Sequence, residues 1–204
     1  MKVELHLHTN RYSGCAVNTP AELMERMVRT GYEAVYITEH DAVWSDWEIR
    51  QLQGGFPDIR IFPGVELSVG PEPVRHIVVL GTNDPEYLRL GRDEQVLEKA
   101  RSEGRLTILA HPFRWEGGRE MLAAGCLPDA IELRSGNHGS PDQVELAEAA
   151  AERLALALVN AGDTHSLDFL NRFWIETDLP LRRAGDIRSI VVNRQYVNCV
   201  EEAG

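Results

Sequence analysis

Short apolar runs alternate with helical patterns along most of the chain. Turn residues bound the apolar runs, and this alternation is typical of βα units arranged around a mainly parallel sheet or barrel. The seven candidate strands lie near residues 3–8, 34–39, 59–66, 75–80, 106–110, 129–133 and 156–161. The pattern therefore predicts an α/β fold.

Capping signals mark three of the segments between these strands. Thr19-Pro20-Ala21-Glu22 is a capping box with proline at the first helical position. Asp84-Pro85 should open a second helix that continues to Gly104. Ser140-Pro141-Asp142-Gln143 repeats the capping box ahead of a helix from 141 to about 154. Each of the three segments is expected to be an α-helix.

One connection is too short to hold a helix. About seven residues separate the run ending near Glu66 from the run starting near Arg75, and they include Gly70, Pro71 and Pro73. Parallel neighbours need a crossover of about a dozen residues or more, so these two strands should form an antiparallel hairpin. The hairpin would bring the start of the fourth strand beside the end of the third.

Length and composition suit one domain and exclude several classes of protein. The chain has 204 residues, 43% of them hydrophobic, and no Pro/Gly/Ser-rich stretch divides it, so residues 1–204 should form one domain. It lacks an apolar run of about 18 residues and a signal-peptide pattern after Met1, which predicts a cytoplasmic protein that does not bind membranes. Its three cysteines form no Cys-x-x-Cys pair, which disfavours a disulfide framework or a thiolate zinc site. The net charge of -11 argues against strong nucleic-acid binding, because such proteins normally display basic patches.

Histidines and carboxylates gather at the ends of the predicted strands. Six of the seven histidines lie where a run ends or, for the hairpin strand, begins: His6, His8, His40, His76, His111 and His165. Glu66, Glu132 and Asp163 lie at the same level. In βα folds ligands bind at the carboxyl-terminal rim of the sheet, so these side chains should converge there.

A single histidine is usually a packed or surface residue, but the joint pattern favours a metal site. Imidazole and carboxylate together select Zn, Mn, Fe or similar divalent ions. His6 and His8 are two apart on a strand, so they project from the same face and can bind one ion together. The lack of Cys ligands favours an open catalytic site over a closed structural one. His138 has no such position, and we expect it to be a loop residue.

Seven motifs follow one another along the chain: His6-Leu7-His8-Thr9, Ile37-Thr38-Glu39-His40-Asp41, Gly64-Val65-Glu66, His76, Ala110-His111-Pro112, Ile131-Glu132 and Gly162-Asp163-Thr164-His165. In this order they resemble the motifs of the PHP (polymerase and histidinol phosphatase) domain family. The resemblance extends from residue 3 to about residue 165. It implies a distorted (βα)7 TIM-like barrel, a site for two or three divalent metal ions, and phosphoesterase activity.

The resemblance also implies which residues hold each ion. They are His6, His8, Glu66 and Asp163 for the first ion, Glu66, His76 and His111 for the second, and His40 and His165 for the third. Glu66 would bridge the first two ions. Glu132 is expected as an outer carboxylate that orients a ligand histidine.

The loop after His8 departs from the family pattern. In the family this loop usually supplies an Asp or His to the third metal, whereas here it reads Asn10-Arg11-Tyr12-Ser13-Gly14-Cys15. The third ion should therefore bind weakly or use water as a ligand.

The expected chemistry follows from the charge of the ions. A water molecule that bridges two cations can have its pKa lowered from about 15.7 to about 7, which supplies hydroxide near neutral pH. The residues expected at the reacting centre are Glu66, Asp163 and His165. Three arginines that follow motifs are candidates for bidentate phosphate binding: Arg11, Arg114 and Arg134. The expected substrate is a small phosphomonoester or a nucleotide, because the net charge leaves few cations for a long nucleic acid.

Two other functions are compatible with the motifs. Amidohydrolases also combine a barrel with an initial His-x-His, but several of them use a carboxylated lysine as the bridging ligand. This chain has Glu66 at that position, and its lysines are Lys2, before the first strand, and Lys99, within a predicted helix. A noncatalytic metal-binding or regulatory module is the second alternative.

Overall fold

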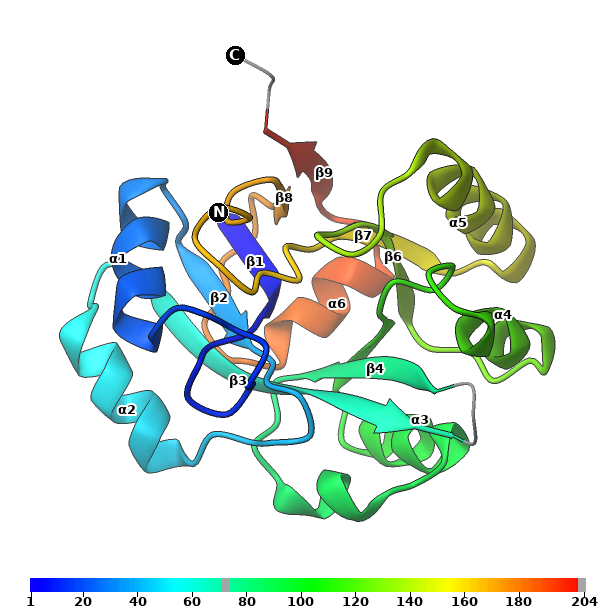
Figure 1. The fold of residues 1–204 in the computed structure, drawn as a ribbon, viewed down its shortest axis with the longest axis horizontal. Helices are drawn as coiled ribbons and strands as arrows, with labels where there is room; N and C mark the ends of the chain where they lie inside the picture. The colour runs from blue at the N-terminus through cyan, green and yellow to red at the C-terminus, as the bar shows by residue number, and fades with distance from the viewer. Residues whose placement is uncertain (71–73, 202–204) are drawn as a thin grey trace.

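A nine-stranded sheet curls around the middle of the molecule in this computed structural model, which describes residues 1–70 and 74–201 (Figure 1). The strand order is β7-β6-β5-β4-β3-β2-β1-β8-β9. The strands are β1 (Lys2–Leu7), β2 (Ala34–Ile37), β3 (Arg60–Val69), β4 (Arg75–Leu80), β5 (Leu106–Leu109), β6 (Ala130–Arg134), β7 (Ala157–Asn160), β8 (Phe173–Glu176) and β9 (Val197–Val200). The helices are α1 (Pro20–Arg29), α2 (Asp46–Gly55), the 3-10 helix η1 (Pro85–Arg89), α3 (Asp93–Ser102), α4 (Glu116–Ala123), α5 (Pro141–Leu154) and α6 (Asp186–Val192).

The seven strands expected from the sequence are present as β1 to β7. Parallel pairs join β1 to β2, β2 to β3, β5 to β6 and β6 to β7. β3 and β4 form the expected antiparallel hairpin, in which Ser68 lies opposite His76. Pro71 and Pro73 of its connection lie outside the described residues. The sheet is nearly closed, so the predicted α/β fold with a distorted barrel is confirmed.

The helices agree with the sequence in two places and differ in a third. Both capping boxes form, and they begin α1 and α5 where the sequence predicts. The prediction of one helix between Asp84 and Gly104 is wrong, because the chain is extended at Leu90 between η1 and α3. There Gly91 O accepts a hydrogen bond from Gly70 N (3.1 Å), at the end of β3, instead of a bond within a helix. None of the helices in the described ranges is long and apolar enough to cross a membrane.

The segment after β7 closes the sheet, and its strands were not predicted. β1 pairs with β8 rather than with β7. At the rim, His8 N donates to Thr164 O (3.0 Å). Further along, the Asn198 side chain bonds to the open edge of β7, since its Nδ2 donates to Leu158 O (2.9 Å) and its Oδ1 accepts from Asn160 N (2.7 Å). A side-chain amide thus makes the hydrogen bonds of a neighbouring strand.

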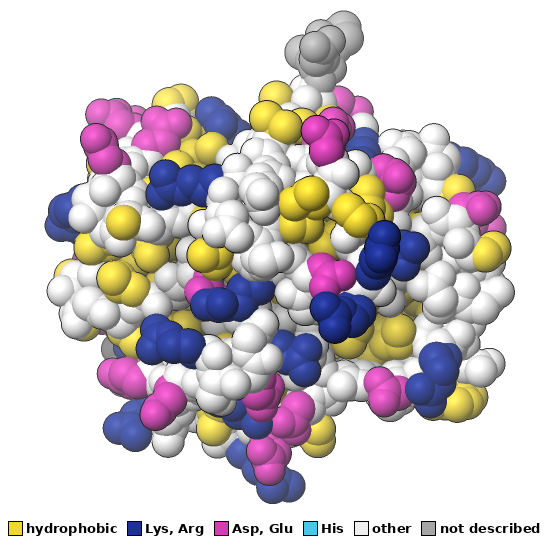
Figure 2. Space-filling model, turned by 180° about the vertical axis from the view of Figure 1, so that it is seen from behind, with side chains coloured by type: hydrophobic (Ala, Val, Ile, Leu, Met, Phe, Trp, Pro, Cys, Tyr) yellow, Lys and Arg dark blue, Asp and Glu magenta, His cyan; other side chains and the backbone are white. Residues whose placement is uncertain are grey.

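The barrel is apolar at one end and rich in histidine at the other. Val78, Leu80 and Ile108 pack in one buried cluster with Ile187 and Ile190 of α6, so this helix covers the apolar end. Figure 1 shows α6 lying across the ring of strands. Figure 2, which views the molecule from behind, shows mixed charges and no histidine on that face. The histidines therefore lie at the opposite end, above a closely packed base.

Candidate metal centre

A bulge in β1 turns both histidines of the His-x-His motif into the barrel. Glu4 pairs with Val35 and Leu7 pairs with Ile37, so β1 takes three residue steps where β2 takes two. A one-residue shift of register reverses the faces to which side chains point. The start of β1 can therefore place its apolar residues in the interior cluster while its end presents histidines to the same interior.

The Glu4 carboxylate satisfies the backbone that the bulge leaves unpaired. Its Oε1 accepts the N–H groups of Leu5 (2.9 Å), His6 (3.0 Å) and Gly162 (2.6 Å). Burial raises the pKa of Glu4 to about 7, although these N–H groups favour the ionised form. A Cβ atom on Gly162 would lie 2.4 Å from Glu4 Oε2, so the contact requires glycine. Glu4 thus ties the bulge to the chain that follows β7.

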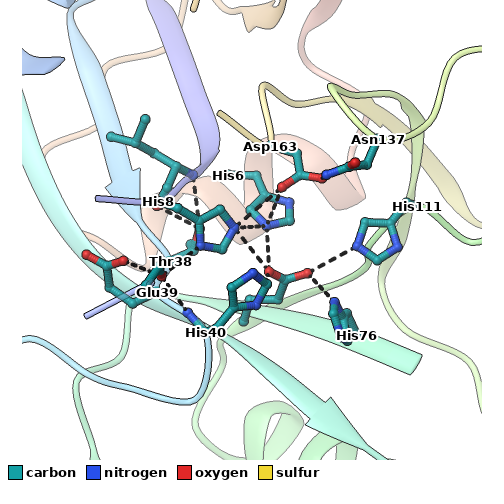
Figure 3. A network of polar contacts seen from close by, with 12 residues as sticks. His6, His8, Thr38, Glu39, His40, His76, His111, Asn137 and Asp163 are labelled. Atoms are coloured by element: carbon teal, nitrogen blue, oxygen red, sulfur yellow. Dashed lines mark hydrogen bonds and ion pairs between the residues drawn. The ribbon is translucent and has the colours of Figure 1, made fainter. Parts of the chain in front are cut away.

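Four of the expected ligands lie together: His6, His8, Glu66 and Asp163. Figure 3 shows His6, His8 and Asp163 pointing toward one another. All four are buried. The Nε2 atoms of His6 and His8 each lie 3.1 Å from Glu66 Oε2, and they lie 3.6 and 3.4 Å from Asp163 Oδ1. The two Nε2 atoms are 3.0 Å apart.

This donor set fits a divalent cation. Atoms that bind one ion tetrahedrally at about 2.0–2.1 Å lie about 3.3 Å from one another, close to the separations of these four side chains. His6 Nδ1 contacts Glu132 and His8 Nδ1 contacts Ser13, so protons on Nδ1 leave two Nε2 lone pairs facing each other. Glu66 Oε2 lies 3.0–3.1 Å from three imidazole nitrogens, but none of these contacts has the geometry of a hydrogen bond among the described residues. A cation between these atoms would replace their repulsion with attraction.

Glu132 holds two ligand segments at once. Its Oε1 lies 2.7 Å from His6 Nδ1, and its Oε2 accepts the backbone N–H of His111 at 2.7 Å. Glu132 is fully buried. Carboxylates that bond the second ring nitrogen of a ligand histidine fix its tautomer and raise its basicity. Glu132 therefore lies outside the group of four and contacts one of the expected ligands, His6.

Ser13 connects His8 to a second buried carboxylate, Glu39. Ser13 Oγ donates to Glu39 Oε2 and lies 3.2 Å from His8 Nδ1. Since the single hydroxyl proton is directed to Glu39, the oxygen accepts from His8 and also from the backbone N–H of His40 (3.1 Å). Glu39 further accepts the indole N–H of Trp44 at 3.1 Å. The loop after His8 thus positions a ligand rather than supplying a carboxylate.

A second group of ligands surrounds the other oxygen of Glu66. His76 Nδ1 lies 2.9 Å and His111 Nε2 lies 3.3 Å from Glu66 Oε1. His40 Nδ1 lies 3.0 Å from Oε2. The two oxygens of one carboxylate therefore face two different sets of nitrogen atoms, which is the arrangement expected of a bridging ligand.

The third group is less complete. The nitrogen atoms of His8, His40 and His165 lie within 4.8 Å of one another. His8 Nδ1 contacts Ser13, so its Nε2 can serve either this group or the buried set, and not both. Cys15 lines the same cavity as His40 and His165, but no carboxylate of the loop joins them.

Two ligands occupy backbone conformations that side chains rarely adopt. His111 has φ 31° and Asp163 has φ 46°, and Asp41, directly after His40, has φ 47°. Left-handed backbone at residues other than glycine is unfavourable and clusters at functional sites. The three residues lie in the turns that follow β5, β7 and β2.

The charges of the site already favour a cation. Burial alone would lower the pKa of His6, but Glu66 and Asp163 hold it well above its ordinary value. Burial would raise the pKa of Glu66, whereas the charge of His6 and contacts with other imidazoles hold it well below. Burial lowers the pKa of His165, and the charge of His8 lowers it further. The carboxylates thus stay ionised, and the deepest histidines attract positive charge.

A cavity of about 380 Å³ opens above the ligands. Arg114 lines it, as do five of the expected ligands: His40, His76, His111, Asp163 and His165. Arg11 instead binds Glu48 through its Nε (2.8 Å), and Arg134 does not line the cavity. Of the three candidate arginines, the structure brings Arg114 to the site and leaves the other two outside it.

Several residues of the site carried no recognisable signal in the sequence. Asn137 Nδ2 donates to Asp163 Oδ2 (2.6 Å), so that Oδ1 faces the histidines. Trp115 and Phe169 line the cavity. His138, expected in a loop, is in a loop but buried, and its Nδ1 bonds Leu133 O (3.1 Å). Polar and aromatic loop residues of this kind are found only when the loops are placed together.

Comparisons of sequence give partial matches. No family model matches the chain. An uncharacterised protein of Methanocaldococcus jannaschii is 29% identical over 126 residues, which are 55% of this chain and 68% of that protein. An error-prone DNA polymerase of Mycolicibacterium paratuberculosis is 27% identical over 165 residues. These cover 74% of this chain but 14% of the polymerase, so the chain corresponds to a small part of that relative.

Two solved structures share the fold. One is a two-domain protein of Bacteroides vulgatus described as containing a predicted PHP-like metal-dependent phosphoesterase, with a TM-score of 0.75 and 18% identity over 98% of this chain and 64% of that chain. The other is an amidohydrolase of Chromobacterium violaceum with bound sulfate, with a TM-score of 0.69 and 16% identity over 97% of this chain and 98% of that chain. The resemblance to the PHP family is confirmed at the level of the fold.

Proposed function

We propose that this chain, whose fold is shared with a PHP-like phosphoesterase, hydrolyses phosphate esters with two or three divalent metal ions, such as Zn, Mn or Fe. One observation carries the proposal. Glu66 is buried, and nitrogen atoms of five histidines lie within 3.3 Å of its two oxygens. A carboxylate shared by so many imidazoles suits a cluster of at least two ions.

Different groups of side chains would hold the individual ions. The first ion would be held by His6, His8, Glu66 and Asp163, the second by Glu66, His76 and His111, and a third by His40 and His165. Bound ions neutralise phosphoryl oxygens and lower the pKa of water, so that a nucleophile is present near neutral pH. Glu132 and Ser13 would keep two imidazoles in the tautomer that presents Nε2. Asn137 would keep Asp163 Oδ1 directed to the same point.

We propose a small phosphate ester as the substrate. The cavity of about 380 Å³ is near the lower end of the range for ligand pockets, about 300–1,000 Å³. Arg114 lines it and can bind phosphate oxygens in pairs. The net charge of -11 disfavours a long nucleic-acid strand. We therefore expect kcat/KM not to rise from a mononucleotide to a long single strand.

Amide hydrolysis is the second candidate, because an amidohydrolase shares the fold. The chain cannot supply a carboxylated lysine to the centre, since both of its lysines lie elsewhere. Lys2, at the start of β1, donates to Thr30 O (3.1 Å), and Lys99, on α3, binds Asp84 and Glu103. This arrangement favours the phosphoesterase.

The test is reconstitution with metal. Protein stripped with a chelator is reloaded with Mn or Zn and assayed with a phosphomonoester, a phosphodiester and an amide. We expect metal-dependent hydrolysis of phosphate esters. Turnover of the amide alone would support the amidohydrolase, and no turnover with firmly bound metal would support a noncatalytic module.

Arg114 offers a matched test of phosphate binding. Arg114→Ala should raise KM for a phosphomonoester by about tenfold or more, because a hydrogen bond to a charged group contributes about 1.5–3 kcal/mol. Arg11→Ala is the control, since Arg11 binds Glu48 on the surface and should leave KM unchanged. Equal KM values for the two variants would remove Arg114 from the proposal.

A further inference from the structure

Two partly exposed aromatic side chains line the cavity above the metal ligands. Trp115 is 42% exposed and Phe169 is 41% exposed, and both lie on the cavity wall. Neither has a function in holding the ions. Large apolar side chains left open to solvent in a site of histidines and carboxylates call for a ligand with an apolar surface.

Trp115 packs beside the second group of expected ligands. Its ring meets the His76 and His111 rings edge to face, with centroids 5.5 and 5.1 Å apart. The Arg114 guanidinium lies over the indole, 4.4 Å from its centroid, and also lines the cavity. Indole rings and guanidinium groups both stack with flat unsaturated rings, so this pair offers two surfaces for such a ligand.

Phe169 is also supported from one side. The Arg172 guanidinium lies 4.4 Å from its ring centroid, and Arg172 does not line the cavity. Since Phe169 itself lines the cavity, the ring offers aromatic surface there while Arg172 contacts it from outside the cavity lining. The two aromatic residues come from the loops before α4 and before β8, so neither depends on the other for its position.

From these contacts we infer a subsite for a flat unsaturated ring, formed by Trp115, Arg114 and Phe169, which binds the alcohol part of the phosphate ester. The inference rests on the proposed function, in which the metal ions bind the phosphoryl group. A cavity of about 380 Å³ holds one phosphate and one ring system, but not a polymer. The preferred substrates are small phosphomonoesters whose alcohol carries such a ring.

The test uses two phosphate esters, of which only one carries a flat unsaturated base. Adenosine 5′-monophosphate and ribose 5-phosphate share the sugar and the ester, so their kcat/KM ratio isolates the contribution of the base. With protein reconstituted with Mn we expect a preference of at least tenfold for the nucleotide, the size typical of one stacked base. Trp115→Leu and Phe169→Leu should reduce this preference, because each should lower kcat/KM for the nucleotide more than kcat/KM for ribose 5-phosphate.

Trp47→Leu is the control variant. Trp47 is 62% exposed and does not line the cavity, so the preference should persist. Equal rates for the two substrates in the unaltered protein would overturn the subsite while leaving the phosphoesterase intact. A Trp115→Leu variant that loses both substrates equally would also overturn it, since the indole would then serve only to pack His76 and His111. Failure to hydrolyse any phosphate ester with metal bound would instead reject the proposed function.

Discussion

The deep and the outer parts of the centre are built differently. The deep part consists of His6, His8, Glu66 and Asp163, all buried, and the outer part consists of His40, His76 and His165. In the deep part each ligand other than Glu66 has a separate polar partner: Glu132, Ser13 or Asn137. The outer histidines have side chains that are 14–29% exposed. Among the described residues, Nδ1 of His40 and Nδ1 of His76 contact Glu66 itself, and Nδ1 of His165 contacts the backbone oxygen of Asp163 (3.0 Å), so none of the three is shown with a separate side-chain partner like those of the deep part.

The ligand side chains of the deep part are therefore more constrained than those of the outer part. Packing and a second hydrogen bond hold a deep ligand in place before an ion binds. Such a side chain therefore loses little conformational freedom when it binds the ion. An outer histidine must be ordered by the ion or by the substrate. We therefore expect tight binding in the deep part and exchangeable binding in the outer part.

Glu66 joins the two parts, so its replacement should have the largest effect. Glu66→Gln should lower the metal content of the protein and reduce kcat by about a thousandfold or more, because ions and nucleophile are lost together. Elemental analysis and steady-state kinetics on the same sample measure both. Glu25→Gln is the control, because the Glu25 side chain on α1 is 63% exposed. A metal content equal to that of the unaltered protein would show that Glu66 does not bridge.

Replacing His165 tests the outer part separately from the deep part. His165→Ala should remove at most one ion per chain and reduce activity less than Glu66→Gln, whereas His8→Ala should empty the deep part. The protein as purified should hold about two ions or more per chain, with the ion near His40 and His165 the first to leave on dialysis. Three ions that remain through dialysis would contradict the difference between the parts.

Replacing Ser13 tests whether metal affinity in the deep part depends on the hydrogen-bond partners of its ligands. Ser13→Ala should weaken metal binding by about 10- to 100-fold, the usual cost of removing such a partner. The reason is that His8 Nδ1 and Glu39 would each lose their contact with the hydroxyl. Ser13→Thr keeps the hydroxyl and should restore most of the affinity. Titration with a competing chelator gives the dissociation constants, and equal values for the alanine and threonine variants would argue against the role.

The base of the deep part can be disturbed without touching a ligand. In Gly162→Ala the new Cβ would lie 2.4 Å from Glu4 Oε2 and 2.5 Å from Thr164 Oγ1, so the free energy of unfolding should fall by about 1–3 kcal/mol. Gly54→Ala, in α2 with open space around it, should instead be neutral or slightly stabilising. Chemical denaturation of both variants measures the contrast. A stable Gly162→Ala protein with normal metal content would show that the bulge tolerates the added methyl group.

The smallest expected effect concerns His138, which lies beside the centre without joining either part. Burial lowers the pKa of His138 below its ordinary value. The folded state therefore binds this proton less readily than the unfolded state, and stability is lost as the pH falls through about 6.5. His138→Gln should reduce this loss, measured as the difference in unfolding free energy between pH 8 and pH 5. An unchanged pH dependence would mean that His138 can be protonated without cost.

Local sequence patterns were sufficient for much of this architecture. The apolar runs predicted β1 to β7, and the short connection predicted the β3–β4 hairpin, because strand periodicity and connection length act over a few neighbouring residues. The histidines and carboxylates at the ends of these strands meet in the structure, as the topology of parallel strands requires. Their binding of metal stays a prediction. The helix expected between Asp84 and Gly104 was wrong because a hydrogen bond from Gly70 competes with it.

The tertiary structure decided what depends on distant partners. The bulge that turns His6 inward is held by Glu4 and Gly162, which are 158 positions apart, and Glu132 reaches His6 across 126 positions. The closure of β7 depends on the side chain of Asn198. No local period encodes such hydrogen bonds, since each forms only after the segments have packed. The residue types needed for the centre can therefore be predicted from the sequence, whereas the hydrogen-bond partners that orient them are determined by how the barrel packs.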